Sequence, residues 1–111
     1  MNANIFRVDK FIVSGHARGE FLAKVQATHK LLRSQPGFVR DYILEQVSGP
    51  GEFNFVTIVE WEGSEYMEPA RQAVAALHER MNCNPSELLV RLGVRADIAN
   101  YRGVDLASFE G

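Results

Sequence analysis

The sequence of 111 residues contains one cysteine, Cys83. A single cysteine cannot form an internal disulfide, and it cannot supply the cysteine cluster of a structural zinc site. No glycine-rich phosphate loop, His-x-x-x-His pair or group of histidines and carboxylates at metal-ligand spacing is present either. The sequence therefore predicts no metal site, and we expect Cys83 to be a half-buried small apolar residue rather than a reactive thiol.

An excess of charge of one sign is also missing. Twelve lysines and arginines stand against fourteen aspartates and glutamates, so the formal net charge is −2. Non-specific binding to nucleic acid needs a basic surface, which this composition does not provide. No apolar run approaches the roughly 18 residues that cross a bilayer, and the N-terminus lacks the pattern of a secretory signal. We expect a cytoplasmic protein without nucleic-acid or membrane partners.

The most strand-like stretch is Phe53 to Glu62, where apolar residues fall on both faces of the predicted strand. One face carries Phe53, Phe55, Val59 and Trp61, and the other carries Val56 and Ile58. Each apolar face of a strand needs a cover. The helices of the chain supply one cover, and a second subunit is the expected source of the other. The sequence therefore predicts a homodimer.

The remaining elements follow from periodicity and from helix-boundary residues. Pro36-Gly37 ends the first helix, Asn84-Pro85 begins the last one, and Gly93 ends it. In the second strand, Phe38, Tyr42 and Leu44 are expected to share one face. The predicted strands are 4–13, 38–47, 53–62 and 94–101, and the predicted helices are 17–33, 68–81 and 84–92.

This order of elements predicts one α+β domain with a ferredoxin-like split βαβ topology and a four-stranded antiparallel sheet. We place the domain at residues 1–101 and a C-terminal tail at 102–111. Leu106 and Phe109 are the apolar residues of the tail that we expect to dock on a neighbouring subunit. The helices cover one face of the sheet, and two sheets packed face to face would form a dimeric α/β barrel.

Several segments resemble the antibiotic biosynthesis monooxygenase family of the dimeric α/β barrel superfamily. They are Thr28-His29-Lys30-Leu31-Leu32-Arg33-Ser34-Gln35-Pro36-Gly37-Phe38, Val56-Thr57-Ile58-Val59-Glu60-Trp61-Glu62, Ala70-Arg71 and Leu92-Gly93-Val94. The resemblance implies a small monooxygenase that uses no metal, flavin or haem. Such an enzyme oxidises a phenolic, anthrone-like or quinol-like molecule, whose anion reacts directly with dioxygen.

The resemblance also implies an apolar pocket between the sheet and its helices. The catalytic candidates are Trp61, Tyr66, His29 and His78, and the candidate substrate-binding residues are Phe53, Phe55 and Thr57. Trp61 and Tyr66 resemble a Trp and a Tyr of one of the family's oxygenases, whereas Thr57 stands where that enzyme has an Asn. The structural alternatives are core packing for Trp61, a hydrogen-bonded core position for His29 and a solvated helix face for His78.

Two other functions remain open. In the haem-degrading branch of the fold the second helix supplies a His ligand, and His78 lies near that position. That branch also has an Asn in the first strand, where this chain has Asp9, and a Trp in the second helix, where this chain has none. The third possibility is a non-enzymatic barrel that binds a small ligand or serves in a stress response.

Overall fold

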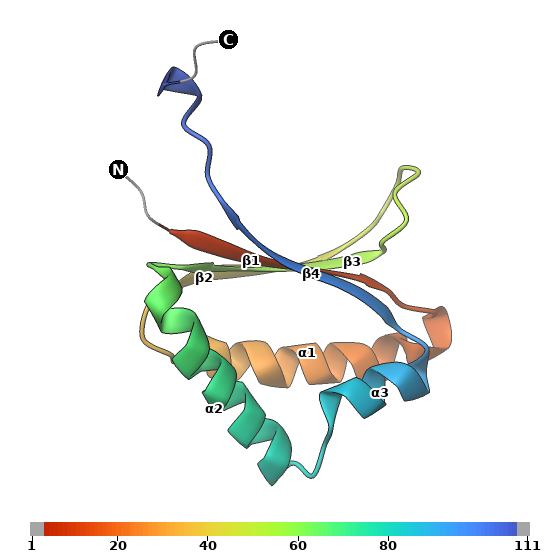
Figure 1. Ribbon diagram of the computed structural model, residues 1–111. Coiled ribbons are helices and arrows are strands. Elements are labelled where there is room, and N and C mark those ends of the chain that lie inside the picture. Colours follow the sequence, from red (N-terminus) through yellow and green to blue (C-terminus); the bar gives the residue numbers. More distant parts are fainter. Residues whose placement is uncertain (1–3, 109–111) are drawn as a thin grey trace.

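The structure is a computed structural model that describes residues 4–108 (Figure 1). Phe109, which was predicted to dock on a neighbouring subunit, lies outside the described residues. The strands are β1 (Ile5–Ile12), β2 (Phe38–Glu45), β3 (Phe55–Trp61) and β4 (Arg95–Arg102). The helices are α1 (Arg18–Leu32), α2 (Met67–Arg80) and α3 (Pro85–Leu92), with short 3₁₀ turns η1 (Gly15–Ala17), η2 (Ser64–Tyr66) and η3 (Leu106–Ser108). None of the described helices has the length and apolar character that crossing a bilayer demands.

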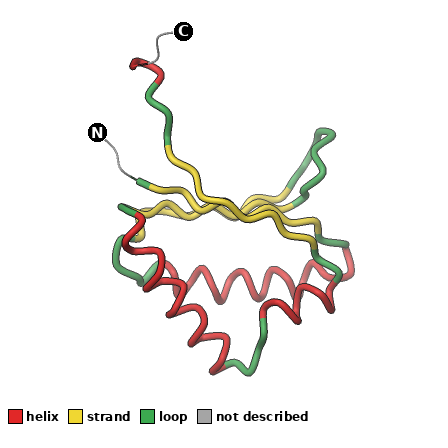
Figure 2. The backbone as a smooth tube through the Cα atoms, in the orientation of Figure 1, coloured by secondary structure: helices red, strands yellow, loops and turns green. Residues whose placement is uncertain are grey.

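The four strands form one antiparallel sheet in the order β2-β3-β1-β4. All three helices lie on the same face of this sheet (Figures 1 and 2). The α+β class and the four-stranded antiparallel sheet predicted from the sequence are therefore confirmed. The predicted start of α3 is confirmed as well, because the Asn84 side chain accepts a hydrogen bond from the backbone N–H of Glu87 and Gly93 ends the helix with φ +69°.

The core between the sheet and the helices has two parts. In the first, the Phe21 ring of α1 packs against Phe11 and Phe55, with ring centroids 4.9 and 5.3 Å away. The second lies under the other end of β3 and contains Val59, Trp61 and Ala70. The predicted alternation of β3 is thus confirmed, because Phe55, Val59 and Trp61 are all buried.

The start of β2 departs from the predicted alternation. Phe38 pairs with Trp61, but Arg40 pairs with the next residue, Glu60, so Val39 is an extra residue in the strand. This irregularity turns Phe38 to the helix side, where its ring meets Trp61 edge-on at 6.1 Å. Because a bulge of one residue reverses the faces that follow it, the prediction that Phe38 shares a face with Tyr42 and Leu44 is wrong.

The loop between β2 and β3 is longer than the predicted turn. β2 ends at Glu45, β3 begins at Phe55, and the backbone N–H of Gln46 donates to the carbonyl of Asn54 to close the loop. This loop and the segment after β4 both project on the side of the sheet that the helices leave uncovered (Figure 1). They carry the exposed residues Val47, Val104 and Leu106.

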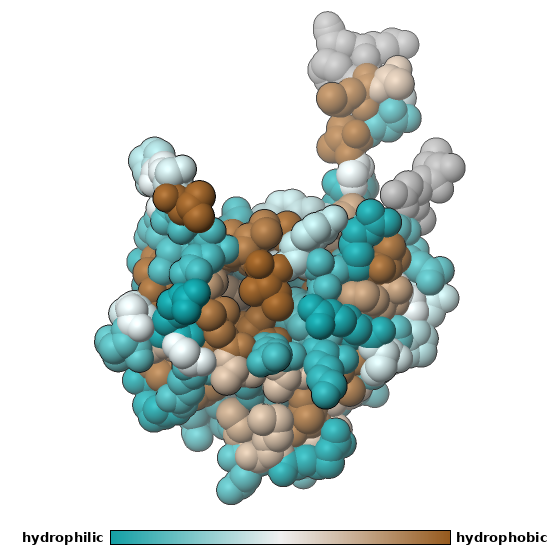
Figure 3. Space-filling view, turned by 180° about the vertical axis from the view of Figure 1, so that it is seen from behind, coloured by the Kyte–Doolittle hydropathy of each residue, from teal (hydrophilic) through white to brown (hydrophobic). Residues whose placement is uncertain are grey.

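The face of the sheet opposite the helices has no cover within residues 4–108. Tyr42, Leu44 and Tyr101 are about half exposed on it, and Val56 and Ile58 of β3 are partly buried. The view from behind in Figure 3 shows hydrophobic side chains gathered in a hollow below the two projecting segments, with hydrophilic ones around them.

Candidate active site

A cavity of about 530 Å³ lies between the sheet and the helices α1 and α2. Its size is that of pockets that bind small molecules. Three groups of residues line it: Arg7, Asp9, Thr57, Val59, Trp61 and Asn100 from the sheet; Thr28, His29 and Leu32 from α1; and Ser64, Met67, Glu68, Ala70, Arg71 and Val74 from η2 and α2.

One side of the cavity is apolar. Trp61 is 3% exposed, and the Phe38 ring packs against it edge-on, so the indole has a fixed orientation. Val59 and Ala70 are buried beside it in the same cluster. A rigid aromatic wall of this kind suits a flat aromatic ligand, because stacked and edge-on ring pairs stabilise each other beyond the area that they bury.

His29 and Asp41 form a buried pair at the α1 side of the cavity. The Nδ1 atom of His29 lies 2.9 Å from Asp41 Oδ2, and both side chains are about nine-tenths buried. Asp41 also accepts a hydrogen bond from Arg33 Nε at 3.0 Å, so its negative charge has a second partner. A carboxylate accepts hydrogen bonds, which assigns the proton of a neutral His29 to Nδ1 and leaves Nε2 as the basic nitrogen.

The β1 and β4 end of the cavity is polar. Arg7 Nε donates to Asp9 Oδ1 at 2.7 Å, and these side chains are 37% and 22% exposed. Arg7 pairs across the sheet with Val59 on one side and Asn100 on the other, while Asp9 pairs with Thr57. Directly opposed residues of antiparallel strands share a face, so all five point into the cavity side of the sheet.

Three of the residues predicted for the site line this cavity, namely Trp61, His29 and Thr57. Tyr66 packs against the cluster around Trp61 without lining the cavity. Phe55 is 2% exposed within the other core cluster, and Phe53 is half-buried just before β3. The catalytic role of Tyr66 and the substrate-binding roles of Phe53 and Phe55 stay predictions from the sequence.

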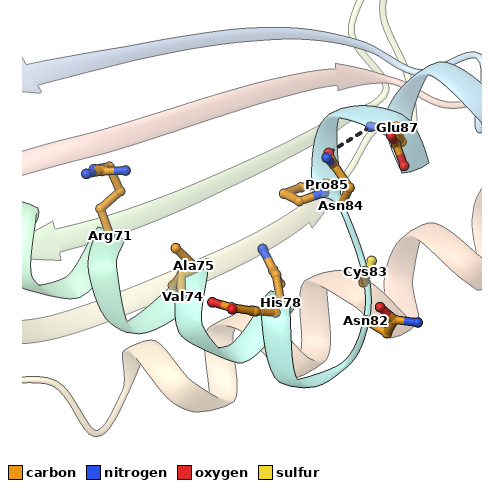
Figure 4. A pocket seen from close by; sticks show the side chains of 10 residues that line it. Arg71, Val74, Ala75, His78, Asn82, Cys83, Asn84, Pro85 and Glu87 are labelled. Atoms are coloured by element: carbon orange, nitrogen blue, oxygen red, sulfur yellow. Dashed lines mark hydrogen bonds between the residues drawn. The ribbon is translucent and has the colours of Figure 1, made fainter.

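His78 lies away from this cavity, beside a second hollow of about 560 Å³ along α2 and the loop to α3 (Figure 4). Its side chain is buried, so it does not occupy a solvated helix face. Nε2 lies 3.4 Å from Thr28 Oγ1. Burial, and secondarily the charge of Lys24, lowers the pKa of His78, which keeps the imidazole neutral at pH 7.

Lys24 also contacts the single cysteine of the chain. Its Nζ lies 3.0 Å from Cys83 Sγ, and Cys83 is half-buried, as predicted. Within residues 4–108 no group of three or more histidines, cysteines and carboxylates is arranged to hold a metal ion.

The sequence analysis did not single out Asp41, Arg7 or Asn100 as residues of the site. Its one signal was that Arg7 and Asp9 interrupt an otherwise apolar strand. A charged residue on the buried face of a strand needs a partner or a cavity, and both are present here. Asp41 and Asn100 gave no local signal, because their neighbours in space are far away in the sequence.

Solved structures with this fold include three with full-length similarity. SnoaB, a cofactor-independent oxygenase from Streptomyces nogalater, is 21% identical, with a TM-score of 0.70 over 93% of this chain and 95% of SnoaB. A proposed antibiotic biosynthesis monooxygenase from Nitrosomonas europaea is 12% identical, with a TM-score of 0.68 over 94% and 93% of the two chains. An Arg-to-Ser variant of MhuD with two manganese protoporphyrin IX molecules bound per active site is 18% identical, with a TM-score of 0.69 over 96% and 99%.

The comparisons define the class of fold. The chain has the ferredoxin-like α+β fold of the antibiotic biosynthesis monooxygenases, as the resemblance in the sequence implied. MhuD, which binds a manganese porphyrin, has the same fold. No family model and no curated protein sequence matches the chain.

Proposed function

We propose that the protein is a cofactor-independent monooxygenase of the antibiotic biosynthesis type, which oxidises a phenolic, anthrone-like or quinol-like small molecule with dioxygen. The observation that carries the proposal is the His29–Asp41 pair at the wall of a cavity that Trp61 makes apolar. This arrangement joins a base, a residue that orients the base, and a flat hydrophobic surface for the ring.

The proposed reaction begins with His29. Its Nε2 removes a proton from the acidic CH₂ group or hydroxyl of the substrate, and the Asp41 carboxylate stabilises the imidazolium that forms. For an anthrone-like CH₂, the carbanion transfers one electron to dioxygen, and the two radicals join as a peroxide anion. The imidazolium returns the proton to give a hydroperoxide. Loss of water then leaves a carbonyl, so CH₂ and O₂ become C=O and H₂O.

The apolar wall of the cavity supports this chemistry. Val59, Trp61 and Ala70 are buried, and burial of a reacting anion among apolar groups protects reduced oxygen species from side reactions. Thr57 lines the same wall and offers a hydroxyl to a substrate oxygen. The haem alternative finds less support, because His78 lines the second hollow and does not line this cavity.

The proposed enzyme is a homodimer. The uncovered sheet face carries Tyr42, Leu44 and Tyr101 about half exposed. A second copy packed on this face would bury these side chains, and burial of apolar area is the main favourable term in protein association. The two projecting segments on the same side of the sheet carry the exposed apolar residues Val47 and Leu106.

Oxygen consumption with a panel of anthrones, hydroquinones and naphthols tests the proposed function. We expect the purified protein to be colourless, to consume oxygen and release the quinone-type product, and to keep its rate after treatment with a chelator. His29→Gln should lower the rate by about 10²-fold or more, the typical contribution of a general base. His16→Gln is the matched control, because His16 is exposed and, within residues 4–108, its side chain bonds only to Ser14.

Two results would overturn the proposal. One is the absence of oxygen uptake with every member of the panel. The other is a His29→Gln variant that is as fast as the wild type. A Soret band that titrates to one haem per chain and disappears in His78→Ala would instead favour the haem-degrading alternative.

A further inference from the structure

A row of four paired residues crosses the whole sheet, and three of them, Val59, Arg7 and Asn100, line the cavity. Asp41 of β2 pairs with Val59 of β3, Val59 pairs with Arg7 of β1, and Arg7 pairs with Asn100 of β4. Opposed residues in antiparallel strands project from the same face. The row therefore has a carboxylate bonded to His29 at one end and a guanidinium beside an amide at the other.

The spacing of the strands sets the distance between the two ends. Neighbouring strands lie about 4.8 Å apart, so the backbones at Asp41 and Arg7 are separated by two spacings, or about 10 Å. Val59 is the apolar residue between them, and Trp61 lies next along the same face of β3. A flat aromatic molecule of two or three fused rings is long enough to reach from one polar end to the other.

Arg7 has donors left for a ligand. Its one ion pair, with Asp9, uses Nε, and no other described side chain hydrogen-bonds with its guanidinium. The two terminal nitrogens of an arginine form a planar pair of donors that matches the two oxygens of a carboxylate. Asn100 supplies an amide donor at the same end of the cavity. Asp9 holds the guanidinium in position and balances its charge while no ligand is bound.

We propose that Arg7 and Asn100 form a carboxylate subsite. The substrate is then an aromatic acid whose carboxylate binds at the β1–β4 end, and whose ionisable hydroxyl or CH₂ group lies at the opposite end against His29. The assignment of the reacting group rests on the proposed function, whereas the carboxylate subsite stands on Arg7, Asp9 and Asn100 alone.

Isothermal titration calorimetry with three probes tests the subsite without turnover. The first probe is a naphthol, the second a hydroxynaphthoate with its carboxylate on the ring remote from the hydroxyl, and the third the isomer with the two groups adjacent. We expect the remote isomer to bind the wild-type protein more tightly than the naphthol, by about tenfold or more. A gain of this size is what one charge-assisted hydrogen bond to the carboxylate contributes. The adjacent isomer has the same charge but cannot reach Arg7 and His29 at once, so it should bind less tightly than the remote isomer.

Variants assign the effect to Arg7. The double variant Arg7→Gln/Asp9→Asn removes both charges and leaves no carboxylate without its partner. It should bind the naphthol like the wild type and lose the preference for the remote isomer, with an unchanged melting temperature. Arg7→Lys keeps the charge without the planar pair of donors, and should keep only part of the preference. Arg80→Gln is the control, because Arg80 is exposed at the end of α2 and does not line the cavity.

The outcomes separate this proposal from the proposed function. Equal affinity of the wild-type protein for the remote isomer and the naphthol would overturn the subsite, even if phenols are oxidised. Equal affinity for the two hydroxynaphthoates would overturn the placement of the reacting group against His29, because binding of the carboxylate alone would then explain the affinity. Tight binding of the remote isomer that depends on Arg7, without any oxygen uptake, would support the subsite and contradict the oxygenase.

Discussion

The Tyr66 ring lies so close to the backbone of Gly37 that a Cβ atom added to Gly37 would stand 2.1 Å from Tyr66 Cγ. Gly37 also has a φ of +83°, which disfavours every residue with a side chain. The backbone N–H of Glu62, at the end of β3, donates to the Gly37 carbonyl at 2.8 Å. The loop after α1, the end of β3 and the turn before α2 therefore meet at this one glycine.

The first prediction concerns the stability of this junction. Gly37→Ala adds both a left-handed backbone penalty and a clash with Tyr66, so we expect it to lower the free energy of unfolding by more than about 2 kcal/mol. Gly93→Ala is the control, because Gly93 has a φ of +69° but no atom within 4 Å of the added Cβ. The free energy of unfolding of Gly93→Ala should fall by only about 1 kcal/mol. Denaturant unfolding compares the two, and equal losses would contradict the close contact.

The second prediction separates packing from substrate contact. Tyr66→Phe keeps the ring against Gly37 and removes a hydroxyl that does not line the cavity, so turnover should stay within about twofold of the wild type. Trp61→Phe changes the cavity wall itself and should weaken substrate binding several-fold to about tenfold. Steady-state kinetics with oxygen detection measures both. A large loss of kcat in Tyr66→Phe, with an unchanged melting temperature, would support the catalytic role predicted from the sequence.

The third prediction concerns the pH dependence of stability that the buried His78 causes. Burial and the neighbouring Lys24 lower its pKa in the folded protein, so the folded state binds fewer protons at His78 than the unfolded state does. Stability from this group is therefore present above the unfolded pKa of about 6.5 and is lost as the pH falls below it.

The melting temperature of wild type and His78→Gln, followed from about pH 7.5 to about pH 5.5, checks this dependence. The wild type should lose more stability over that range than the variant, which has no group to protonate at position 78. Carboxylates such as Glu45 and Glu68 are common to both proteins, so their contributions cancel in the comparison. Parallel curves would show that protonation of His78 does not affect folding.

The fourth prediction concerns the uncovered sheet face. Sedimentation at micromolar concentration should give a particle of twice the chain mass of 12.5 kDa. Ile58→Asp places a charge on that face of β3, where burial against a second sheet would leave it unpaired, and should yield a monomer. Val90→Asp, on the exposed side of α3, is the control and should leave the dimer intact. A wild-type protein that sediments as a stable monomer would contradict the proposed dimer.

The sequence alone determined those parts of the fold that depend on neighbouring residues. Alternation along β3 identified its two apolar faces, and Asn84, Pro85 and Gly93 marked the ends of α3. These signals work because strand pleat, helix caps and turns involve residues within a few positions of one another. The order of the elements then predicted a four-stranded antiparallel sheet, which the structure confirms.

Only the tertiary structure decided which polar residues meet. The extra residue at Val39 reverses the faces of β2, and no local pattern marks it. Asp41 reaches His29 from a different element, and Arg7 and Asn100 become neighbours across strands that are more than 90 positions apart in the sequence. Strand register and helix docking are decided by the summed burial and hydrogen bonding of distant segments. The cavity and its two polar ends therefore exist only once the sheet has assembled and α1 and α2 have packed against it.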